Sequence, residues 1–505
     1  MMLASSRNHG TRRPRRQRFT RLLMGAAAIG LPLAMTASPA PAVPTRAQQQ
    51  RPVEARPNIL FILIDDMGFA DLSVMGDRKV ATPNIDKLAH DGALMTKFYD
   101  AAPICSASRA GFFTGRFPAE MGFFSFINNH AYNAKVGQVD WLDPKVPNLA
   151  RMLHNAGYAT AHFGKWHLGG GRDVGDAPWP MAYGFDEQLT TFEGLGPRVL
   201  VSDEERGLAD QSAKLGQGPF FYEKKTFLTQ LYAQKALDFV SRHKDKPWFV
   251  QLWLNDVHDP WAPDEWAFDA VKGHGRNADD DRYLATIAKM DRTLGDMIDR
   301  LKDMGEYDNT LIVLTSDNGP SALQRYYKDG ATPPGSVQPF GGAETLRGRK
   351  GSNYEGGIRQ PLIISWPGHV KAGTRDDVTV GNGVDLMPTF AAAAGIAAPS
   401  SAEGINLLPA AEGHPINHRP TLFWAFGRPG AEMMPRGPFD PHDQAPPLAV
   451  RDGDWKLLAN GDYSDVQLYD LATDPIETTN LAAQQKSITT RLLAKLTAWR
   501  KRFHP

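Results

Sequence analysis

A lone cysteine and an arginine four residues later are the first candidates for chemistry in this chain of 505 residues. Cys105 is the only cysteine, so it has no disulfide partner within the chain. If a helix begins at Cys105, Arg109 lies one turn further on, beside the cysteine side chain. A guanidinium and the first N–H groups of a helix attract anions and favour a thiolate or another electron-rich nucleophile. A lone cysteine is more often buried and inert, but the organised sequence around Cys105 favours a nucleophile.

Oxygen-donor side chains follow two apolar segments of the chain. Asp65 and Asp66 come directly after one segment, and Asp317 and Asn318 come after another. Each pair alone is compatible with a solvated loop or a turn. Two adjacent carboxylates at the end of an apolar strand, however, would repel each other without a cation. Oxygen donors suit a hard divalent cation, and calcium is favoured over zinc because no histidine or thiolate set has zinc spacing.

Basic side chains accompany these oxygen donors. Taken singly, each would be read as surface charge or, for a histidine, as a core residue. Several cations that converge beside a metal ion instead describe a site for a tetrahedral oxyanion. The candidates are Arg109, Lys165, His167, His258 and Lys350, the last in a glycine-rich stretch.

The elements that position these groups follow from the hydrophobic pattern. Four apolar runs read as strands buried on both faces, at residues 58–64, 158–163, 248–254 and 310–315. Helical patterns occur at residues 84–92, 147–157, 226–243 and 279–304. The alternation predicts an α/β fold with a mainly parallel sheet. Ligands of such sheets bind beyond the carboxyl ends of the strands, so the polar clusters that follow the four runs should share one edge.

The C-terminal part predicts a smaller unit without assigned chemistry. A helical pattern at 384–395 precedes an Ala/Pro/Ser-rich stretch. Short strands are expected at 421–426, 448–451 and 455–458, the last two joined by an Asp-Gly turn, and a final helix starts at Ile488. We therefore assign residues 56–396 to a catalytic domain and residues 397–505 to a C-terminal subdomain.

The N-terminus has the order of a secretory signal. Seven arginines precede an apolar run from Leu22 to Met35 that is too short to span a bilayer, and small residues follow. We predict a signal peptide at 1–40, of the Sec or twin-arginine type, a linker at 41–55 and a periplasmic or secreted protein without a membrane span. The chain has 56 basic and 56 acidic residues, so removal of seven arginines changes the net charge from 0 to −7. This balance argues against nucleic acid as a partner.

Together these motifs resemble the type I sulfatases of the alkaline-phosphatase-like superfamily. Cys105-x-Ala107-x-Arg109 followed by Thr114-Gly115-Arg116 is similar to the family signature, in which proline usually stands where this chain has Ala107. The stretch that begins at Lys350 resembles the family's Lys-Gly-x-x-Tyr-Glu-Gly-Gly segment. The resemblance extends from Pro57 to about Gly368, with the motifs in the family order.

The resemblance implies a large, mainly parallel sheet flanked by helices, with a small C-terminal antiparallel sheet and a helix. It implies that a formylglycine-generating enzyme converts Cys105 to formylglycine (3-oxoalanine), whose aldehyde hydrate is the nucleophile. It also implies a calcium ion held by residue 105 together with Asp65, Asp66, Asp317 and Asn318, and a role for Asp317 in deprotonating the attacking hydroxyl. The expected reaction is hydrolysis of a sulfate ester to an alcohol and inorganic sulfate.

The same resemblance implies roles for the basic residues. Arg109 and Lys165 would hold the hydrate in place. His258 or Lys350 would protonate the leaving oxygen, and His167 would take the proton of the second hydroxyl so that sulfate is expelled.

Two alternatives stay open from the sequence. A phosphate or phosphonate monoesterase of the same superfamily would share the fold, the metal and the nucleophile. A catalytically silent binding protein would show a degraded site, whereas every expected position is occupied here. The substrate, a small-molecule (aryl) or a carbohydrate sulfate ester, is also open. Trp253, Trp261 and the aromatic cluster Phe123–Phe126 could line a leaving-group pocket, but buried core aromatics are favoured.

Overall fold

The first apolar run of the folded body forms the central strand β1 (Asn58–Ile64), and every one of its residues is buried. Its side chains alternate between two hydrophobic clusters. Leu60 and Ile62 pack on one face of the sheet, and Phe61 and Leu63 pack on the other. A strand covered on both faces needs no polar residues between the apolar ones, which explains the continuous run in the sequence.

The computed structural model describes residues 56–76, 79–170, 174–191, 194–202, 206–215, 218–321 and 346–503. These residues fall within the unit Gln49–Pro505. The predicted signal peptide and the linker lie outside the described residues. Among the residues that are described, no helix has the length and apolar character needed to cross a bilayer.

The central sheet has eleven strands and is mainly parallel, as predicted. Its strands are β1, β2 (Ala93–Tyr99), β3 (Ala159–Lys165), β4 (Glu187–Thr191), β5 (Arg198–Val201), β6 (Phe220–Glu223), β7 (Trp248–Leu254), β8 (Thr310–Ser316), β9 (Arg359–Ser365), β10 (Thr374–Asp376) and β11 (Gly381–Asn382). Their order is β10-β2-β9-β8-β1-β7-β3-β4-β5-β6, and β11 pairs with β2. Only β9 runs against its neighbours β2 and β8.

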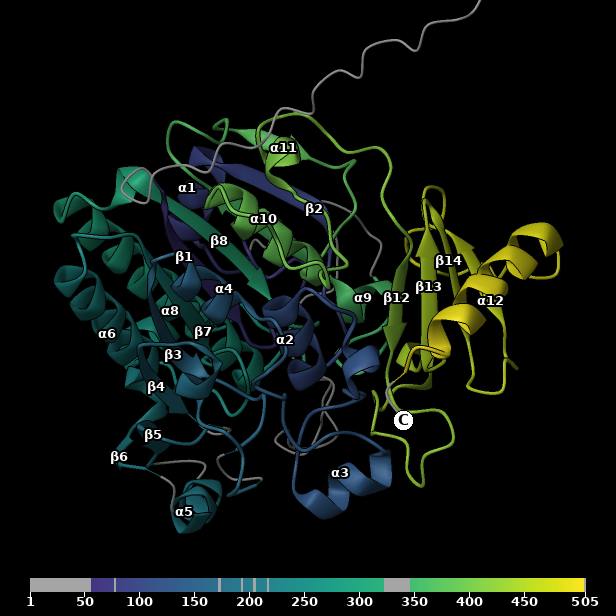
Figure 1. Ribbon diagram of the computed structural model, residues 1–505, viewed down its shortest axis with the longest axis horizontal. Coiled ribbons are helices and arrows are strands. Elements are labelled where there is room, and N and C mark those ends of the chain that lie inside the picture. The colour runs from purple at the N-terminus through teal and green to yellow at the C-terminus, as the bar shows by residue number, and fades with distance from the viewer. Residues whose placement is uncertain are drawn as a thin grey trace, which may run out of the picture. The chain divides into compact units, whose positions relative to one another are not determined.

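Helices cover both faces of this sheet (Figure 1). The hydrophobic cluster on one face includes residues of α1 (Pro83–Asp91), α6 (Leu228–Arg242) and α8 (Ala278–Asp303). The cluster on the other face includes residues of α2 (Cys105–Thr114), α4 (Leu149–Asn155) and α10 (Leu386–Ala393). Further helices in the connections are α3 (His130–Val136), α5 (Arg206–Leu215), α7 (Glu265–Val271), α9 (Glu355–Ile358) and α11 (Leu408–Ala411). Helices on both faces of a parallel sheet are the expected α/β architecture.

A second, four-stranded antiparallel sheet forms the C-terminal part, drawn in yellow and yellow-green in Figure 1. Its strands are β12 (Leu422–Ala425), β13 (Leu448–Asp452), β14 (Trp455–Ala459) and β15 (Gln467–Asp470), in that order. The last helix, α12 (Lys486–Arg500), packs on this sheet through the buried side chains of Leu492, Leu496 and Trp499. The small antiparallel sheet with a helix is therefore present as expected.

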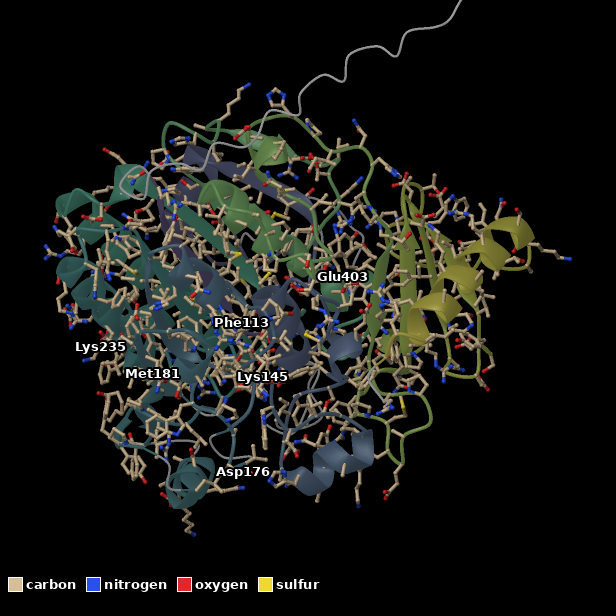
Figure 2. All side chains as sticks on the ribbon, viewed as in Figure 1. Phe113, Lys145, Asp176, Met181, Lys235 and Glu403 are labelled. Carbon is tan, nitrogen blue, oxygen red and sulfur yellow. The ribbon has the colours of Figure 1, made fainter. Side chains whose placement is uncertain are left out.

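The structure refines the sequence reading in two respects. Strand β3 continues to Lys165, two residues beyond the predicted run, so that lysine is part of the strand. Most aromatic residues considered for a leaving-group pocket belong to the interior, because Trp253, Trp261, Phe123 and Phe124 are at most 6% exposed, whereas Phe126 is half-buried. Figure 2 shows Phe113 of α2 among the crowded side chains at the middle of the body, and its ring meets those of Trp166 and Trp253.

Candidate active site

The four predicted strand ends lie side by side at one edge of the sheet. Strands β8, β1, β7 and β3 are consecutive neighbours and run parallel to one another. Ile64, the last residue of β1, pairs with Leu254 of β7 and with Ser316 of β8. The polar residues that follow these strands are thereby brought together although they are far apart in sequence. The Asp66 N–H, for example, donates a hydrogen bond to Asp317 Oδ1, and these two residues are 251 positions apart.

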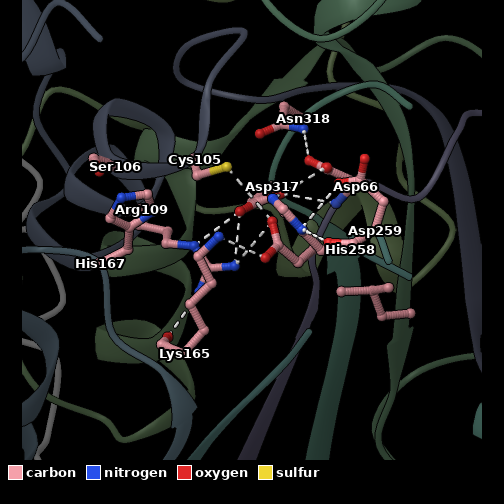
Figure 3. Close-up of polar contacts among 12 residues, drawn as sticks. Asp66, Cys105, Ser106, Arg109, Lys165, His167, His258, Asp259, Asp317 and Asn318 are labelled. Carbon is pink, nitrogen blue, oxygen red and sulfur yellow. Dashed lines mark hydrogen bonds and ion pairs between the residues drawn. The ribbon is translucent and has the colours of Figure 1, made fainter. Parts of the chain in front are cut away.

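Helix α2 begins at Cys105, as the sequence suggested, and ends at Thr114; the next residue, Gly115, caps it in the left-handed conformation. The Cys105 Sγ lies 3.5 Å from Asp65 Oδ1, and Arg109 follows one turn along the buried helix. Because α2 starts at the edge where the strands end, its first residue faces the acidic cluster (Figure 3).

The acidic cluster has the composition of a cation site. Ligand atoms of Asp65, Asp66, Cys105 and Asp317 all lie within 4.8 Å of one another, and all four residues are buried. Asn318 Nδ2 donates to Asp66 Oδ1 at 2.7 Å, while Asn318 Oδ1 is buried and accepts no hydrogen bond from any described residue. Buried carboxylates and an unsatisfied amide oxygen fit a hard divalent cation.

Three cationic side chains balance the three carboxylates. Arg109 directs Nε and one terminal nitrogen to Asp317 Oδ2 at 2.8 and 2.7 Å, and its other terminal nitrogen donates to the Lys165 carbonyl at 2.8 Å. Lys165 Nζ lies 2.7 Å from Asp65 Oδ2, and Lys350 Nζ lies 2.6 Å from Asp66 Oδ1. When all three carboxylates are ionised, the three positive and three negative groups leave the cluster without net charge. A bound divalent cation would therefore make it positive and attractive to an anionic ester.

Burial and these pairings shift the pKa values within the cluster. Burial alone would raise the pKa of Asp65, but Lys165 and Arg109 outweigh it and hold the value well below the usual range. Burial and the charge of Asp65 raise the pKa of Asp317 to about 7. Burial also raises the pKa of the Cys105 thiol despite the nearby lysines. The expectation that this position favours a thiolate is therefore wrong, because a buried thiol beside carboxylates keeps its proton.

His258 follows β7 and faces the same cluster. Its Nε2 lies 3.8 Å from Asp66 Oδ2, while its Nδ1 lies 2.7 Å from the Asp259 carbonyl oxygen and 3.2 Å from Asp259 Oδ1. Burial, together with Lys350 and Lys165, lowers the pKa of His258 well below the usual value. Its side chain is 27% exposed, whereas those of Asp65, Asp66 and Arg109 are fully buried. His258 therefore lies at the opening of the site.

His167 follows β3 in the left-handed backbone region, with a φ of 54°. Its Nε2 lies 3.3 Å from the carbonyl oxygen of Ile127, and the Ile127 N–H donates to Ser106 Oγ at 2.8 Å. His167 is thereby linked to the first turn of α2, next to Cys105. A positive φ at a non-glycine residue carries strain that the surrounding contacts must offset.

The glycine-rich stretch brings Lys350 to the cluster by close backbone packing. The Gly319 N–H donates to the Gly357 carbonyl at 3.0 Å, and a Cβ on Gly319 would lie 2.1 Å from the Gly356 oxygen. These glycines therefore let the Lys350 segment approach the loop after β8.

The structure also places three residues at the site that the sequence reading did not assign to it. Asp259 contacts His258, and Trp253 lies under the guanidinium of Arg109, with 5.0 Å from the Arg109 Cζ to the ring. Lys225 donates to the His258 carbonyl and, at 2.6 Å, to the Pro260 carbonyl. Asp259 adjoins His258 in sequence, which was a usable signal. No local sequence pattern marks Lys225, because the backbone carbonyl that it binds belongs to His258, 33 residues later in the chain.

Comparison with known proteins finds sulfatases as relatives of this chain. The family model for sulfatases matches residues 57–396, and a model described as N-sulphoglucosamine sulphohydrolase, C-terminal, matches residues 349–502. The chain is 33% identical to the N-acetylgalactosamine-6-sulfatase of Canis lupus familiaris over 384 residues, which are 73% of this chain and 68% of the relative.

Solved structures show the same architecture. The crystal structure of Ps i-CgsB in complex with k-i-k-neocarrahexaose aligns with a TM-score of 0.71 at 26% identity, covering 89% of this chain and 94% of that chain. The phosphonate monoester hydrolase of Agrobacterium radiobacter, at 22% identity and a TM-score of 0.59, covers 88% of this chain and 96% of that one and shares the fold. The chain therefore belongs to the type I sulfatase family of the alkaline-phosphatase-like superfamily and is a sulfuric-ester hydrolase.

Proposed function

We propose that this sulfatase uses formylglycine made from Cys105 and a calcium ion held by residue 105 with Asp65, Asp66, Asp317 and Asn318. The observation that supports the proposal is the convergence of the ligand atoms within 4.8 Å, with Cys105 among them. The Cys105 Sγ stands where an oxygen of the hydrated aldehyde would lie. The raised pKa of the thiol makes the unmodified cysteine a poor nucleophile, which favours a modified residue.

The modified residue would supply a hydroxyl nucleophile and a second hydroxyl for release of sulfate, and calcium would supply a Lewis acid. Arg109 would orient residue 105, because its guanidinium is fixed by Asp317, the Lys165 carbonyl and the face of Trp253. Lys165 would bind charged oxygens of the ester beside residue 105.

Proton transfer would be divided among the remaining groups. Asp317, whose pKa is raised to about 7 in the chain without a cation, would accept a proton from the attacking hydroxyl. His258, at the opening of the site, or Lys350 would protonate the leaving oxygen. His167 would accept the proton of the second hydroxyl. The contact of His258 Nδ1 with Asp259 directs its Nε2 toward the cluster. Because burial and the two lysines lower the pKa of His258, its imidazole would have to gain a proton before it could act as the acid, so this orientation does not rank it above Lys350.

The domain organisation and the export of the chain are parts of the same proposal. Residues 1–40 would be a signal peptide and residues 41–55 a linker, followed by the catalytic domain 56–396 and the C-terminal subdomain 397–505. The order of basic, apolar and small residues at the N-terminus supports export to the periplasm or the medium. A formylglycine-generating enzyme would act on Cys105 during maturation.

The decisive experiment is mass spectrometry of the peptide that carries Cys105. Trypsin cleavage after Lys97 and after Arg109 releases Phe98–Arg109 as one peptide. Conversion of the thiol to an aldehyde lowers its mass by about 18 Da. Hydrolysis of 4-nitrophenyl sulfate should increase in proportion to the converted fraction, and Cys105→Ala should have essentially no activity. Unmodified cysteine in a preparation with high turnover would refute the nucleophile assignment.

The phosphate or phosphonate monoesterase alternative is tested with the same preparation. The rates on 4-nitrophenyl sulfate, 4-nitrophenyl phosphate and a phenyl phosphonate ester are compared at equal converted fraction. We expect the sulfate to be the preferred substrate. A higher kcat/KM for either phosphorus ester would make the alternative the principal activity.

A further inference from the structure

A cavity of about 360 Å³ lies where the Lys350 segment meets the C-terminal part of the chain. Gly351 forms part of its wall, and the opposite wall comes from Phe426 and from the loop between β12 and β13, which includes Met434, Arg436 and Phe439. The volume falls in the range of pockets that bind small molecules.

Two connections place this cavity beside the reactive residue. Gly351 directly follows Lys350, whose Nζ lies 2.6 Å from Asp66 Oδ1. The Gly351 N–H donates at 2.7 Å to the carbonyl of Pro103, two residues before Cys105. The wall of the cavity is therefore joined through the backbone to Lys350 and to the segment that leads into α2, on the Lys350 side of residue 105.

The walls of the cavity are held together by hydrogen bonds. Asn353 Nδ2 donates to the carbonyls of Pro446 and Pro447 at 3.1 and 2.9 Å. The Gly348 N–H donates at 2.9 Å to Asp443 Oδ1. These contacts fix the loop between β12 and β13 to the segment that carries Lys350, so the cavity is formed before a ligand arrives, which reduces the entropic cost of binding.

Arg436 gives the cavity its chemical character. Its guanidinium carbon lies 4.1 Å from the centre of the Phe439 ring, an arrangement that holds the planar group in place. Among the residues that the structure describes, none makes a hydrogen bond or an ion pair with Arg436. A stacked guanidinium with available N–H groups is suited to a carboxylate or a sulfate, which it can bind through two parallel hydrogen bonds. Phe426 and Met434 add apolar surface for the face of a ring.

We propose that this cavity binds the leaving-group side of the substrate and that its occupant is a sugar carrying a carboxylate or a second sulfate. This inference rests on the proposed function, because it assigns the cavity to the alcohol that the reaction releases. A neutral aryl group could pack against Phe426 and Met434, but it would offer no anion to the Arg436 guanidinium. Arg436 and Phe439 are then residues that determine specificity rather than residues that take part in the reaction.

Binding is best measured in the Cys105→Ala background, where the substrate is not consumed. The probes are three disaccharides in which the same sulfated hexosamine is linked to glucuronate, to a sulfated galactose or to neutral galactose. Calorimetry should show that at least one anionic probe binds about tenfold to a hundredfold more tightly than the neutral one, as expected for charge-assisted hydrogen bonds. The two anionic probes also distinguish a carboxylate from a sulfate as the preferred group.

Arg436→Gln should remove this preference and leave the affinity for the neutral probe within about twofold. Arg436→Lys should restore only part of it, because lysine lacks the planar fork. Arg300→Gln is the matched control, since Arg300 is an exposed arginine on α8 that pairs with Asp303. Equal affinities for the three probes, or a preference that survives in Arg436→Gln, would overturn the proposal.

Failure of this proposal is distinguishable from failure of the proposed function. The reaction itself is tested in the chain with native Cys105 and native Arg436. Turnover of 4-nitrophenyl sulfate and the mass of the Cys105 peptide therefore report on the reaction itself. The calorimetric ratios report on the cavity, whatever the result of the turnover assay.

Discussion

Lys456 of β14 should be one of the most destabilising residues to remove, because it is a buried cation between two buried carboxylates. Its Nζ lies 3.0 Å from Glu355 Oε1 and 2.9 Å from Glu477 Oε1, and the side chains of all three residues are inaccessible to solvent. Glu355 begins α9, five residues after Lys350, so this ion pair network fastens the small sheet to the segment that carries a residue of the site.

The size of the effect follows from burial. Removing one partner of a buried ion pair costs about 3–5 kcal/mol, since the remaining charge is left without compensation. For a folded body of roughly 450 residues, the entropy of unfolding converts each kcal/mol into about 1 °C of the unfolding midpoint. Lys456→Met should therefore lower the midpoint at pH 8 by about 3–5 °C.

The loss should depend on pH in a defined direction. Burial, which outweighs Lys456, raises the pKa of Glu477 to about 7, above its ordinary value of 4.5. The folded state therefore binds this proton more tightly than the unfolded state, and stability falls as pH rises from about 4.5 to 7. Without Lys456, no cation lies between the carboxylates of Glu355 and Glu477, so their repulsion is stronger at a pH where both are ionised. The difference between the variant and the wild type should thus be larger at pH 8 than at pH 5.

Differential scanning calorimetry at pH 5 and pH 8 measures both effects. Lys495→Met is the control, because Lys495 is 37% exposed and pairs with Asp452 at 3.0 Å, and such pairs contribute less than about 1 kcal/mol. Lys456→Met/Glu477→Gln should recover part of the loss, since Tyr99 still donates to Glu355 at 2.6 Å. Either of two results would refute the reasoning. One is an unfolding midpoint at pH 8 within about 1 °C of the wild type, which is the shift expected for a surface ion pair. The other is a loss of the same size at pH 5 and pH 8.

Three further predictions concern the site. Exhaustive chelation should lower the unfolding midpoint and added calcium should restore it, because a ligand that binds only the native state stabilises it; full activity in a preparation free of divalent metal by elemental analysis would contradict this. Asp317→Ala should abolish hydrolysis of 4-nitrophenyl sulfate, since it removes an oxygen of the acidic cluster and the partner of Arg109; wild-type kcat/KM in this variant would exclude both roles. His258→Ala should reduce kcat/KM for esters of poor leaving groups far more than for nitrophenyl esters, which need little protonation. Equal losses across a leaving-group series would point to Lys350 as the acid or to a purely binding role for His258.

The local sequence determined the central strands and the residues that follow them. Strands β1, β3, β7 and β8 are covered on both faces, so each is encoded as an uninterrupted apolar run that is visible without knowledge of its neighbours. Their parallel arrangement then requires the polar residues after them to share one edge. The acids, the amide, Lys165 and the two histidines end or follow these strands, so their order along the chain predicted that they would meet. Arg109 was predicted from its spacing to Cys105 and Lys350 from the glycine-rich stretch, with the family resemblance supplying the proposed roles.

Only the tertiary structure decided the remaining features, because they depend on segments that are distant in sequence. Strand β2 is interrupted by the adjacent polar residues Thr96 and Lys97, and β9 contains Pro361, so neither has the apolar run of a central strand. The two strands pair with each other in antiparallel fashion. The burial that keeps a proton on Cys105 comes from surrounding elements, not from its helix turn. The cavity beside Lys350 exists because hydrogen bonds join Asn353 to a loop more than ninety positions later in the chain. Such contacts leave no local pattern, and only the folded chain brings their partners within reach.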